Sequence, residues 1–436
     1  MLSIPTDCPS REKGGFTGDI QIYAKTAMLN EEMTPFLTGW LKNLKAAQAE
    51  NGAVPITVPE TAPYRRLMAA NAREFGDEPP VGVAGWSDAA VLVPYTMYRL
   101  TGNRRILEEQ YESMTHWCGY IIRTAEGRHG DFGLPHEADS VLWNTGFHFG
   151  EWLIPSEEKG ITQKEACQRS AFYTAPIFGY LSVKCMAEIA EVLQKPEQAY
   201  YSRTAGQMKA AIQTALICDR ALRSQNMGAY VLMIAFDLVP EHCKEHFAQK
   251  LISLLDSHHG CLDTGFLATP FLLDAFVKIG RRDLAIKLLW QTRMPSWLYE
   301  VEQGATSVWE SWDAITPGSE PRITSYNHYA FGCVDAWIFE NIAGIRALEP
   351  GFRRVEIAPD PDGLPLEYCR RSFRCEYGDL LVFWDRQTLR VSIPCGVRAV
   401  IRWHGASHEV GSGEYTFTEP HRGGDQNERT GQYPIL

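Results

Sequence analysis

Apolar residues in the first 350 positions follow two kinds of helical pattern, and the two kinds alternate along the chain. One kind is apolar on every side, at 88–100, 171–193, 225–238, 265–279 and 327–342. The other carries a single apolar stripe at three-to-four spacing, at 31–50, 106–124, 198–216, 242–255 and 282–290. A helix that is apolar all round is buried, whereas a striped helix covers a core from outside. With a further helix at 19–29, the pattern predicts eleven helices paired as hairpins.

The lengths of the connections distinguish between two possible arrangements of these hairpins. A closed ring, called an α/α toroid, and a linear solenoid or bundle would use the same helices. Turns inside the hairpins are short, but three connections between hairpins are long, at 53–87, 126–170 and 293–326. Long loops are usually functional, and each of these precedes an apolar helix. They would gather at one mouth of a ring, so we expect a mainly α toroid over residues 1–350.

The pattern changes at about residue 351, where short alternating segments replace the helices. These segments lie between turns rich in Gly, Pro and Asp, at 354–358, 370–377, 380–384, 389–393, 399–403 and 414–417. Such spacing is typical of a β-sandwich, so we expect a small C-terminal β-sandwich domain over 351–418. The last residues, 419–436, are polar and glycine-rich, and we expect a flexible tail there.

Composition excludes several classes of function. A formal net charge of −11 and the lack of a basic stripe argue against a nucleic-acid partner. No apolar run is long enough to span a membrane. The eleven cysteines form no CxxC pair and fit reduced thiols better than a disulfide framework, and no signal-peptide pattern opens the chain, so we expect a cytoplasmic protein. No P-loop, GxSxG or HExxH motif is present, and we expect neither metal nor cofactor. The oligomeric state stays open.

Three carboxylates, Asp7, Glu12 and Asp19, fall within thirteen residues near the start of the chain. Proline and glycine interrupt this segment, so it cannot be one helix and is expected to be a loop. Loops on rigid scaffolds often carry catalytic residues. On spacing alone, however, a solvated acidic loop with Asp19 capping the next helix is the better interpretation.

Further acids stand beside aromatic residues in the long connections. They are Trp86 with Asp88, Glu151 with Trp152, and Glu310 between Trp309 and Trp312, with His328 following. Indole faces stack on sugar rings, and carboxylates accept hydrogen bonds from hydroxyl groups. Glycosidic cleavage also requires a pair of carboxyl groups. For Asp88 alone, helix capping explains the residue equally well. Taken together, the clusters favour a saccharide cleft.

Five motifs in this order resemble the bacterial α-L-rhamnosidases of glycoside hydrolase family 78. They read TDCPSREKGGFTGD from residue 6, GWSDA from 85, FGEWL from 149, GATSVWESWD from 304 and NHYAFG from 327. The resemblance implies an (α/α)6 barrel and an inverting exo-glycosidase that removes terminal α-L-rhamnose. It implies Glu12 as general acid and Glu310 as general base. We expect nine further residues to bind the substrate: Asp7, Asp19, Trp86, Asp88, Glu151, Trp152, Trp309, Trp312 and His328.

The chain departs from the family pattern at Phe16, where Trp is common, and at Glu151, where Asp is common. Family members usually carry β-modules and another barrel helix before the first motif. Eleven helices leave a six-hairpin ring one short, so we expect those parts to be missing. Two alternatives stay open. One is a non-catalytic saccharide-binding remnant. The other is a related toroid acting on uronides, as hydrolase or lyase, which should carry Arg or Lys among its mouth motifs.

Overall fold

A computed structural model of the chain describes residues 4–60, 62, 81–127, 130, 132–134, 141–156 and 161–418. Its contacts divide into two compact units. The first unit comprises Met1–Ala24, Met33–Tyr95 and Arg104–Cys333. The second unit comprises Lys25–Glu32, Thr96–Asn103 and Val334–Leu436.

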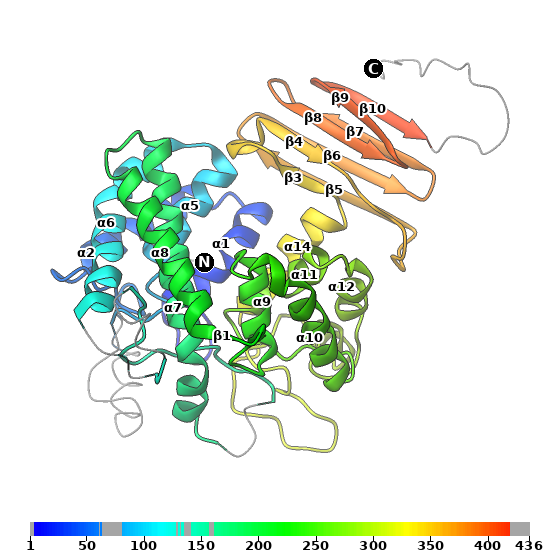
Figure 1. The fold of residues 1–436 in the computed structure, drawn as a ribbon. Helices are drawn as coiled ribbons and strands as arrows, with labels where there is room; N and C mark the ends of the chain where they lie inside the picture. The colour runs from blue at the N-terminus through cyan, green and yellow to red at the C-terminus, as the bar shows by residue number, and fades with distance from the viewer. Residues whose placement is uncertain are drawn as a thin grey trace. The chain divides into compact units, whose positions relative to one another are not determined.

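Each helix that the sequence predicts is present (Figure 1). The helices are α1 (Thr17–Asn30), α2 (Thr34–Ala47), α5 (Ala89–Thr101), α6 (Arg104–Gly127), α7 (Gln163–Val192), α8 (Gln198–Leu216), α9 (Met227–Ala235), α10 (Lys244–Ser257), α11 (Thr269–Lys278), α12 (Arg282–Leu289), α13 (Trp297–Glu302) and α14 (Val334–Asn341), the last preceded by a 3-10 turn at Ala330–Cys333.

Burial confirms the alternation of apolar and striped helices. In α9, each residue from Met227 to Ile234 is buried. The next helix, α10, buries one stripe, formed by Phe247, Leu251, Leu254 and Leu255. Helix α9 contacts α7, α10 and α11, whereas α8 packs along α7 and α12 packs along α11. The apolar helices are therefore the inner members of the hairpins.

Two expectations about the long connections are wrong. Helix α7 begins at Gln163 rather than at residue 171, because Thr162 and Glu165 form a capping box there. Its first turns are mostly exposed, so no apolar stripe marks them. Helix α13, Trp297–Glu302, lies inside the stretch that was expected to be irregular from 293 to 326. It is six residues long, too short for a periodic pattern to reveal.

The second unit contains two four-stranded sheets, with strand orders β10-β7-β6-β5 and β3-β4-β8-β9. All neighbours are antiparallel except β4 and β8. Each sheet buries one face, which is the arrangement of the expected β-sandwich. The strands are β3 (Ile345–Ala347), β4 (Arg354–Ile357), β5 (Tyr368–Cys375), β6 (Gly378–Asp385), β7 (Thr388–Ile393), β8 (Arg398–Trp403), β9 (Ala406–Val410) and β10 (Gly413–Thr418).

Three strand features escaped the sequence pattern. The edge strand β9 is almost wholly exposed, so it shows no alternation of apolar and polar residues. Strand β3 lies before residue 351, and we propose that the β-domain begins at or before Ile345. A hairpin of β1 (Ile217–Cys218) and β2 (Ala221–Leu222) follows α8. The tail predicted at 419–436 lies outside the described residues.

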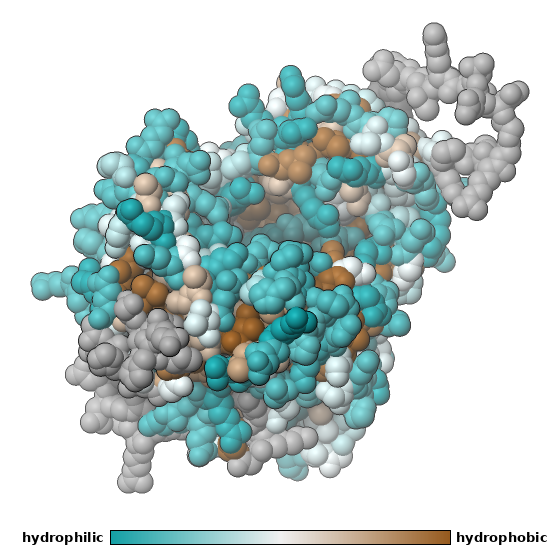
Figure 2. Space-filling view, viewed as in Figure 1, coloured by the Kyte–Doolittle hydropathy of each residue, from teal (hydrophilic) through white to brown (hydrophobic). Residues whose placement is uncertain are grey.

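The surface and the cysteines bear on the remaining expectations. On the face drawn in Figure 2, hydrophilic residues predominate and hydrophobic residues form small separate patches. All eleven cysteines are free thiols. Within the described parts of the chain, no helix combines the length and apolar content needed to cross a bilayer. The cytoplasmic location stays a prediction.

Candidate active site

The N-terminal loop is fixed by its own backbone before α1 begins. Asp7 N donates to the Gly14 carbonyl at 2.9 Å, and Gly14 N donates to Asp7 Oδ1 at 2.7 Å. Val58 N donates to the Gly15 carbonyl at 2.8 Å. A Cβ atom on Gly15 would lie 2.3 Å from the Val58 carbonyl oxygen, so only glycine allows this approach. The loop that carries Asp7 and Glu12 is therefore held in one place.

Glu12 and Glu310 meet at a single guanidinium group, that of Arg11. Arg11 Nη2 donates to Glu310 Oε1 at 2.8 Å and to Oε2 at 2.7 Å. The same nitrogen forms an ion pair with Glu12 Oε1. Burial alone lowers the pKa of Arg11, but Glu310 and Glu12 outweigh it and raise that pKa, so the guanidinium stays charged. The two residues predicted as acid and base are neighbours, although they are far apart in the sequence.

The carboxylate of Glu310 has further partners that fix its orientation. Its Oε2 accepts hydrogen bonds from Thr324 Oγ1 and from Ser325 N, each at 3.1 Å. Glu310 N donates to the Ser325 carbonyl at 2.9 Å. The side chain is 9% exposed, so one edge still meets the solvent. A buried carboxylate with an accessible edge can accept a proton from a water molecule.

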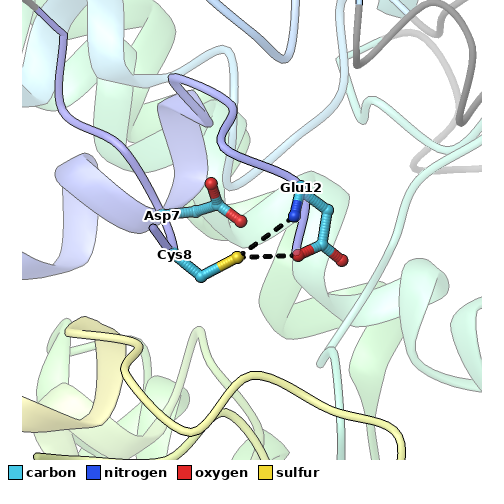
Figure 3. Close-up of side chains that lie close together, drawn as sticks. All are labelled: Asp7, Cys8 and Glu12. Carbon is cyan, nitrogen blue, oxygen red and sulfur yellow. Dashed lines mark hydrogen bonds between the residues drawn. The ribbon is translucent and has the colours of Figure 1, made fainter. Parts of the chain in front are cut away.

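Glu12 is oriented by a thiol (Figure 3). The Cys8 thiol donates to Glu12 Oε2 at 2.9 Å, and its sulfur accepts from Glu12 N at 3.2 Å. Burial and the bond to Glu12 raise the pKa of Cys8 to about 11, so the thiol keeps its proton. Ligand atoms of Asp7, Cys8 and Glu12 lie within 4.8 Å of one another. Hydrogen bonds account for this proximity, and we assign Cys8 to positioning Glu12 rather than to a metal site.

Asp7, Asp19 and His328 form a buried electrostatic group. His328 Nε2 lies 3.0 Å from Asp19 Oδ1, and both side chains are 4% exposed. Burial alone lowers the pKa of His328, but the hydrogen bond and charge of Asp19 raise it above its usual value. Burial, followed by the charge of Asp19, raises the pKa of Asp7 to about 7. The two acids expected to hold sugar hydroxyls therefore lie beside an imidazole that favours its protonated form.

The aromatic residues of two loops adjoin this group. Trp86 packs on Phe149 with ring centroids 4.8 Å apart, and Phe149 packs on Trp152 at 5.3 Å. Trp86 also lies over Gly18, where a Cβ atom would come within 2.6 Å of the indole ring. Because Gly18 directly precedes Asp19, the start of α1 and the two tryptophan loops meet at one place.

The other two tryptophans, Trp309 and Trp312, are also buried. Trp312 stacks on Phe331 at 4.4 Å, Phe331 lies 4.9 Å from Phe266, and Phe266 lies 5.4 Å from His328. This series joins the loop of Glu310 to His328. Trp309 is 2% exposed and belongs to a buried hydrophobic cluster. Contact of these two tryptophans with a sugar stays a prediction, and their packing also makes them supports for Glu310.

Asp88 has protein partners for both carboxylate oxygens. Its Oδ2 accepts from Gly85 N at 2.7 Å. Its Oδ1 accepts from Trp117 Nε1 at 3.1 Å and from Ser182 Oγ at 2.5 Å. It is fully buried, and burial raises its pKa. These bonds tie the start of α5 to α6 and α7, so the structure favours a positioning role for Asp88. Direct contact with a substrate stays a prediction.

The carboxylate of Glu151 lies at the N-terminal end of α11. Its Oε2 accepts from Gly265 N at 2.9 Å and its Oε1 accepts from Ala268 N at 2.7 Å. Both N–H groups belong to the turn that leads into α11, and a carboxylate at this end of a helix is favoured by the helix dipole. The residue is 2% exposed. Glu151 therefore fixes its loop, and with it Trp152, against α11, and sugar contact by Glu151 stays a prediction.

Sequence reasoning missed two charged residues of the site. Arg11 stands beside Glu12, and its position in an acidic motif could have marked it as the partner of both carboxylates. Glu300 lies on α13, which was not predicted, and no pattern separates it from Glu302. Its Oε2 accepts from Trp309 N at 3.1 Å, and its buried Oε1 has no partner among the described residues. Burial raises the pKa of Glu300 from 4.5 to about 8.

Glu300 gives a testable pH dependence of stability. A carboxyl with a raised pKa stabilises the fold fully below pH 4.5, its ordinary pKa, and this contribution is lost as the pH rises to about 8. The loss is on the order of a few kcal/mol. Glu300→Gln keeps an acceptor for Trp309 N but cannot ionise. Urea unfolding at about pH 5 and about pH 9 should show a smaller loss of stability for Glu300→Gln than for the wild type.

The matched control is Glu302→Gln, an exposed residue on the same helix. It should keep the wild-type pH dependence. If Glu300→Gln loses as much stability as the wild type between the two pH values, Glu300 is not held neutral by burial.

The fold and the site together define a class. The loops bring two carboxylates and several aromatic rings together at one place on a scaffold of helical hairpins. This is the architecture of the six-hairpin glycosidases. Residues 1–342 match the family described as the bacterial alpha-L-rhamnosidase 6 hairpin glycosidase domain, and residues 344–415 match the bacterial alpha-L-rhamnosidase C-terminal domain. The chain belongs to the bacterial α-L-rhamnosidase family. The family resemblance and the fold predicted from the sequence are thereby confirmed.

Individual relatives are similar over almost the whole chain. An α-L-rhamnosidase of Streptomyces avermitilis is 33% identical over 448 residues, which cover 96% of this chain and 39% of the relative. An α-L-rhamnosidase of Formosa agariphila is 32% identical over 412 residues, which cover 92% of this chain and 41% of the relative. The structure is also similar to the crystal structure of the Streptomyces avermitilis α-L-rhamnosidase complexed with L-rhamnose, with a TM-score of 0.83 and 31% sequence identity. The match covers 96% of this chain and 40% of that chain. The chain spans less than half the length of these relatives.

Proposed function

We propose that this chain is an inverting exo-glycosidase that removes terminal, non-reducing α-L-rhamnose from rhamnosides or rhamnose-containing oligosaccharides. Glu12 is the general acid and Glu310 the general base. The relatives in Streptomyces avermitilis and Formosa agariphila are α-L-rhamnosidases, which supports the choice of sugar. The proposed reaction uses no cofactor.

The observation that carries the proposal is the contact of both carboxylates with one nitrogen of Arg11. Glycosidic cleavage needs one carboxyl to protonate the leaving oxygen and a second to activate a water molecule or to attack. Glu12 and Glu310 come from distant motifs and lie close enough together to serve as this pair, which supports the proposal. Asp19 and His328 supply polar groups for sugar hydroxyls close by.

The proposed reaction balances with two proton transfers. The carboxyl proton of Glu12 passes to the glycosidic oxygen as the bond between that oxygen and the anomeric carbon breaks. The oxygen of a water molecule bonds to the anomeric carbon from the opposite face, and the water gives a proton to Glu310. Glu12 is then a carboxylate and Glu310 a carboxylic acid, and exchange of one proton with solvent restores both.

Arg11 sets a condition on this reaction. Inversion needs carboxyl groups roughly 6.5–9.5 Å apart, because the water must fit as well as the sugar. Since one Arg11 nitrogen touches both side chains, the nearest oxygens of Glu12 and Glu310 lie closer than that range. We propose that a bound rhamnoside displaces the guanidinium and lets the two carboxyl groups separate. A separation of about 5 Å belongs to retaining enzymes, so the stereochemistry of the product is the decisive measurement.

Proton NMR of freshly released sugar tests the reaction and its stereochemistry. With an aryl α-L-rhamnoside, we expect β-rhamnose to appear first and the α anomer to follow by mutarotation, because water attacks the face opposite the leaving group. An aryl β-L-rhamnoside is the matched control and should not be cleaved. If α-rhamnose appears first, the enzyme retains configuration and Glu310 is a nucleophile. If rhamnose binds and no aryl group is released, the chain is a non-catalytic saccharide-binding remnant.

A related toroid hydrolase or lyase for uronides is the second candidate, since Arg11 is the kind of cation that a uronate requires. Its charge is already matched by Glu12 and Glu310. The neighbouring carboxyl groups, those of Asp7 and Asp19, would repel a uronate. We therefore favour the neutral sugar. Faster cleavage of an unsaturated uronide than of an aryl rhamnoside would reverse this preference.

A further inference from the structure

The sheet β10-β7-β6-β5 of the second unit has one buried face and one exposed face. Strands β5, β6 and β7 lie side by side in it (Figure 1). Strand β6 buries Leu380, Val382 and Trp384. Because side chains alternate along a strand, Leu381 and Phe383 point to the opposite face. These two apolar residues are not part of the core of the β-sandwich.

Two aromatic rings share the exposed face. Tyr368, on β5, is 61% exposed, and Phe383 is half-buried. Their ring centroids are 6.2 Å apart and their planes meet at 26°. The register pairs Tyr368 with Asp385, so Tyr368 and Phe383 are diagonal neighbours. Nearly parallel rings on a sheet surface are suited to stacking against the C–H face of a sugar.

Two arginines flank Phe383. The register pairs Phe383 with Arg370 on β5 and with Arg390 on β7. The guanidinium carbon of Arg390 lies 5.5 Å from the centre of the Phe383 ring. Both arginines are exposed, and within the described residues neither forms an ion pair with a carboxylate. Their charges are available to a ligand.

Among the described residues, no acid of this face forms an ion pair with Arg370 or Arg390. Asp385 Oδ1 accepts from two backbone N–H groups of the turn that follows it, at 2.9 and 2.7 Å. Asp379 lies 3.9 Å from Arg374. Glu414 stands on β10 opposite Ser392 of β7, diagonal to Arg390, and forms no ion pair with it among the described residues. The surface around Phe383 is therefore aromatic and carries two guanidinium groups that are paired with no carboxylate among the described residues, with Asp385 at its edge.

We propose that the surface formed by Tyr368, Arg370, Phe383 and Arg390 binds a saccharide chain that carries carboxylates, such as a chain of uronate residues. The rings stack on sugar rings, and each guanidinium donates paired N–H groups to a carboxylate. The net charge of the whole chain is −11, so the attraction comes from this local pair of arginines. All four residues belong to the second unit, and the proposal does not depend on hydrolysis in the first.

Isothermal titration of the full chain with an oligogalacturonate tests the proposal. The matched ligand is the same oligosaccharide with its carboxyl groups methyl-esterified, which removes the charge and keeps the rings. We expect the acidic form to bind more weakly as salt is added, and the ester to bind at least about tenfold more weakly than the acid. Tyr368→Ser, and the double change Arg370→Gln with Arg390→Gln, should each weaken binding of the acidic form roughly tenfold.

Two control variants replace the same types of residue elsewhere on the second unit, each at a single position. Tyr377 is 41% exposed in the turn between β5 and β6, and Arg398 is exposed on β8 of the other sheet. Tyr377→Ser and Arg398→Gln should bind the acidic oligosaccharide as the wild type does. The proposal is overturned if the wild type does not bind it, if the ester binds equally well, or if the control variants weaken binding as much as Tyr368→Ser.

Discussion

Replacing Glu12 or Glu310 by glutamine is expected to lower kcat for an aryl α-L-rhamnoside by roughly 100- to 10,000-fold. Glutamine keeps the size of the side chain, but it neither gives nor accepts the proton that the reaction moves. KM should change little, because Asp7, Asp19 and His328 stay in place. Steady-state kinetics of the two variants beside the wild type measure both quantities.

The leaving group separates the two roles. A general acid matters less when the leaving oxygen is already a weak base, so the defect of Glu12→Gln should shrink with a more acidic phenol as leaving group. The defect of Glu310→Gln should stay the same, because activation of water does not depend on the leaving group. Glu302 is an exposed residue on α13, and Glu302→Gln should keep wild-type activity. Full activity in either of the first two variants would contradict the assignment of that residue.

Asp19→Ala is expected to destabilise the first unit by about 3 kcal/mol or more, because it leaves the buried His328 without its partner. KM for an aryl rhamnoside should rise as well, since a proposed sugar contact is lost. His328 has a raised pKa, so the ion pair contributes fully below pH 6.5, its ordinary value, and the contribution is lost as the pH rises through the raised pKa. Urea unfolding should therefore show a smaller effect of Asp19→Ala at alkaline pH.

Two further variants serve as controls for the stability effect of Asp19→Ala. Glu109→Ala breaks an exposed pair with Arg105 on α6 and should cost no more than about 0.5 kcal/mol. Asp19→Asn keeps an oxygen that accepts a hydrogen bond from His328 and should fall between the wild type and Asp19→Ala. An effect of Asp19→Ala no larger than that of Glu109→Ala would mean that the pair with His328 contributes little to stability.

Much of the fold could be predicted because periodicity reports burial directly. The residues of α9 are apolar on all sides and those of α10 on one, and burial follows that difference. The predicted elements are wrong where exposed residues leave no periodic pattern of apolar positions in the sequence. The start of α7 is set by the hydrogen bonds of Thr162 and Glu165, and β9 is held by backbone pairing with β8 at an exposed edge. Polar termini and edge strands carry no hydrophobic pattern.

The site was predictable in its residue types and only partly in its contacts. Glu12 and Glu310 were singled out by motif, and their contact with one guanidinium depends on how the loops approach each other. Asp88 and Glu151 illustrate the reverse case. Both stand beside a tryptophan in the sequence, yet backbone and side-chain donors occupy their carboxylate oxygens. A sequence lists donors and acceptors but does not say which of them will pair.

The sequence by itself determined the alternation of inner and outer helices, the change to strands near residue 350, and the acidic and aromatic motifs that mark the family. These properties depend on neighbours within a few residues, which the order of amino acids specifies directly. Only the tertiary structure decided that Arg11 joins Glu12 to Glu310, and that Arg370 and Arg390 flank Phe383. It also decided that Glu300 is buried with one oxygen that has no partner among the described residues. Each of these depends on burial and pairing between segments that the chain brings together only when it folds.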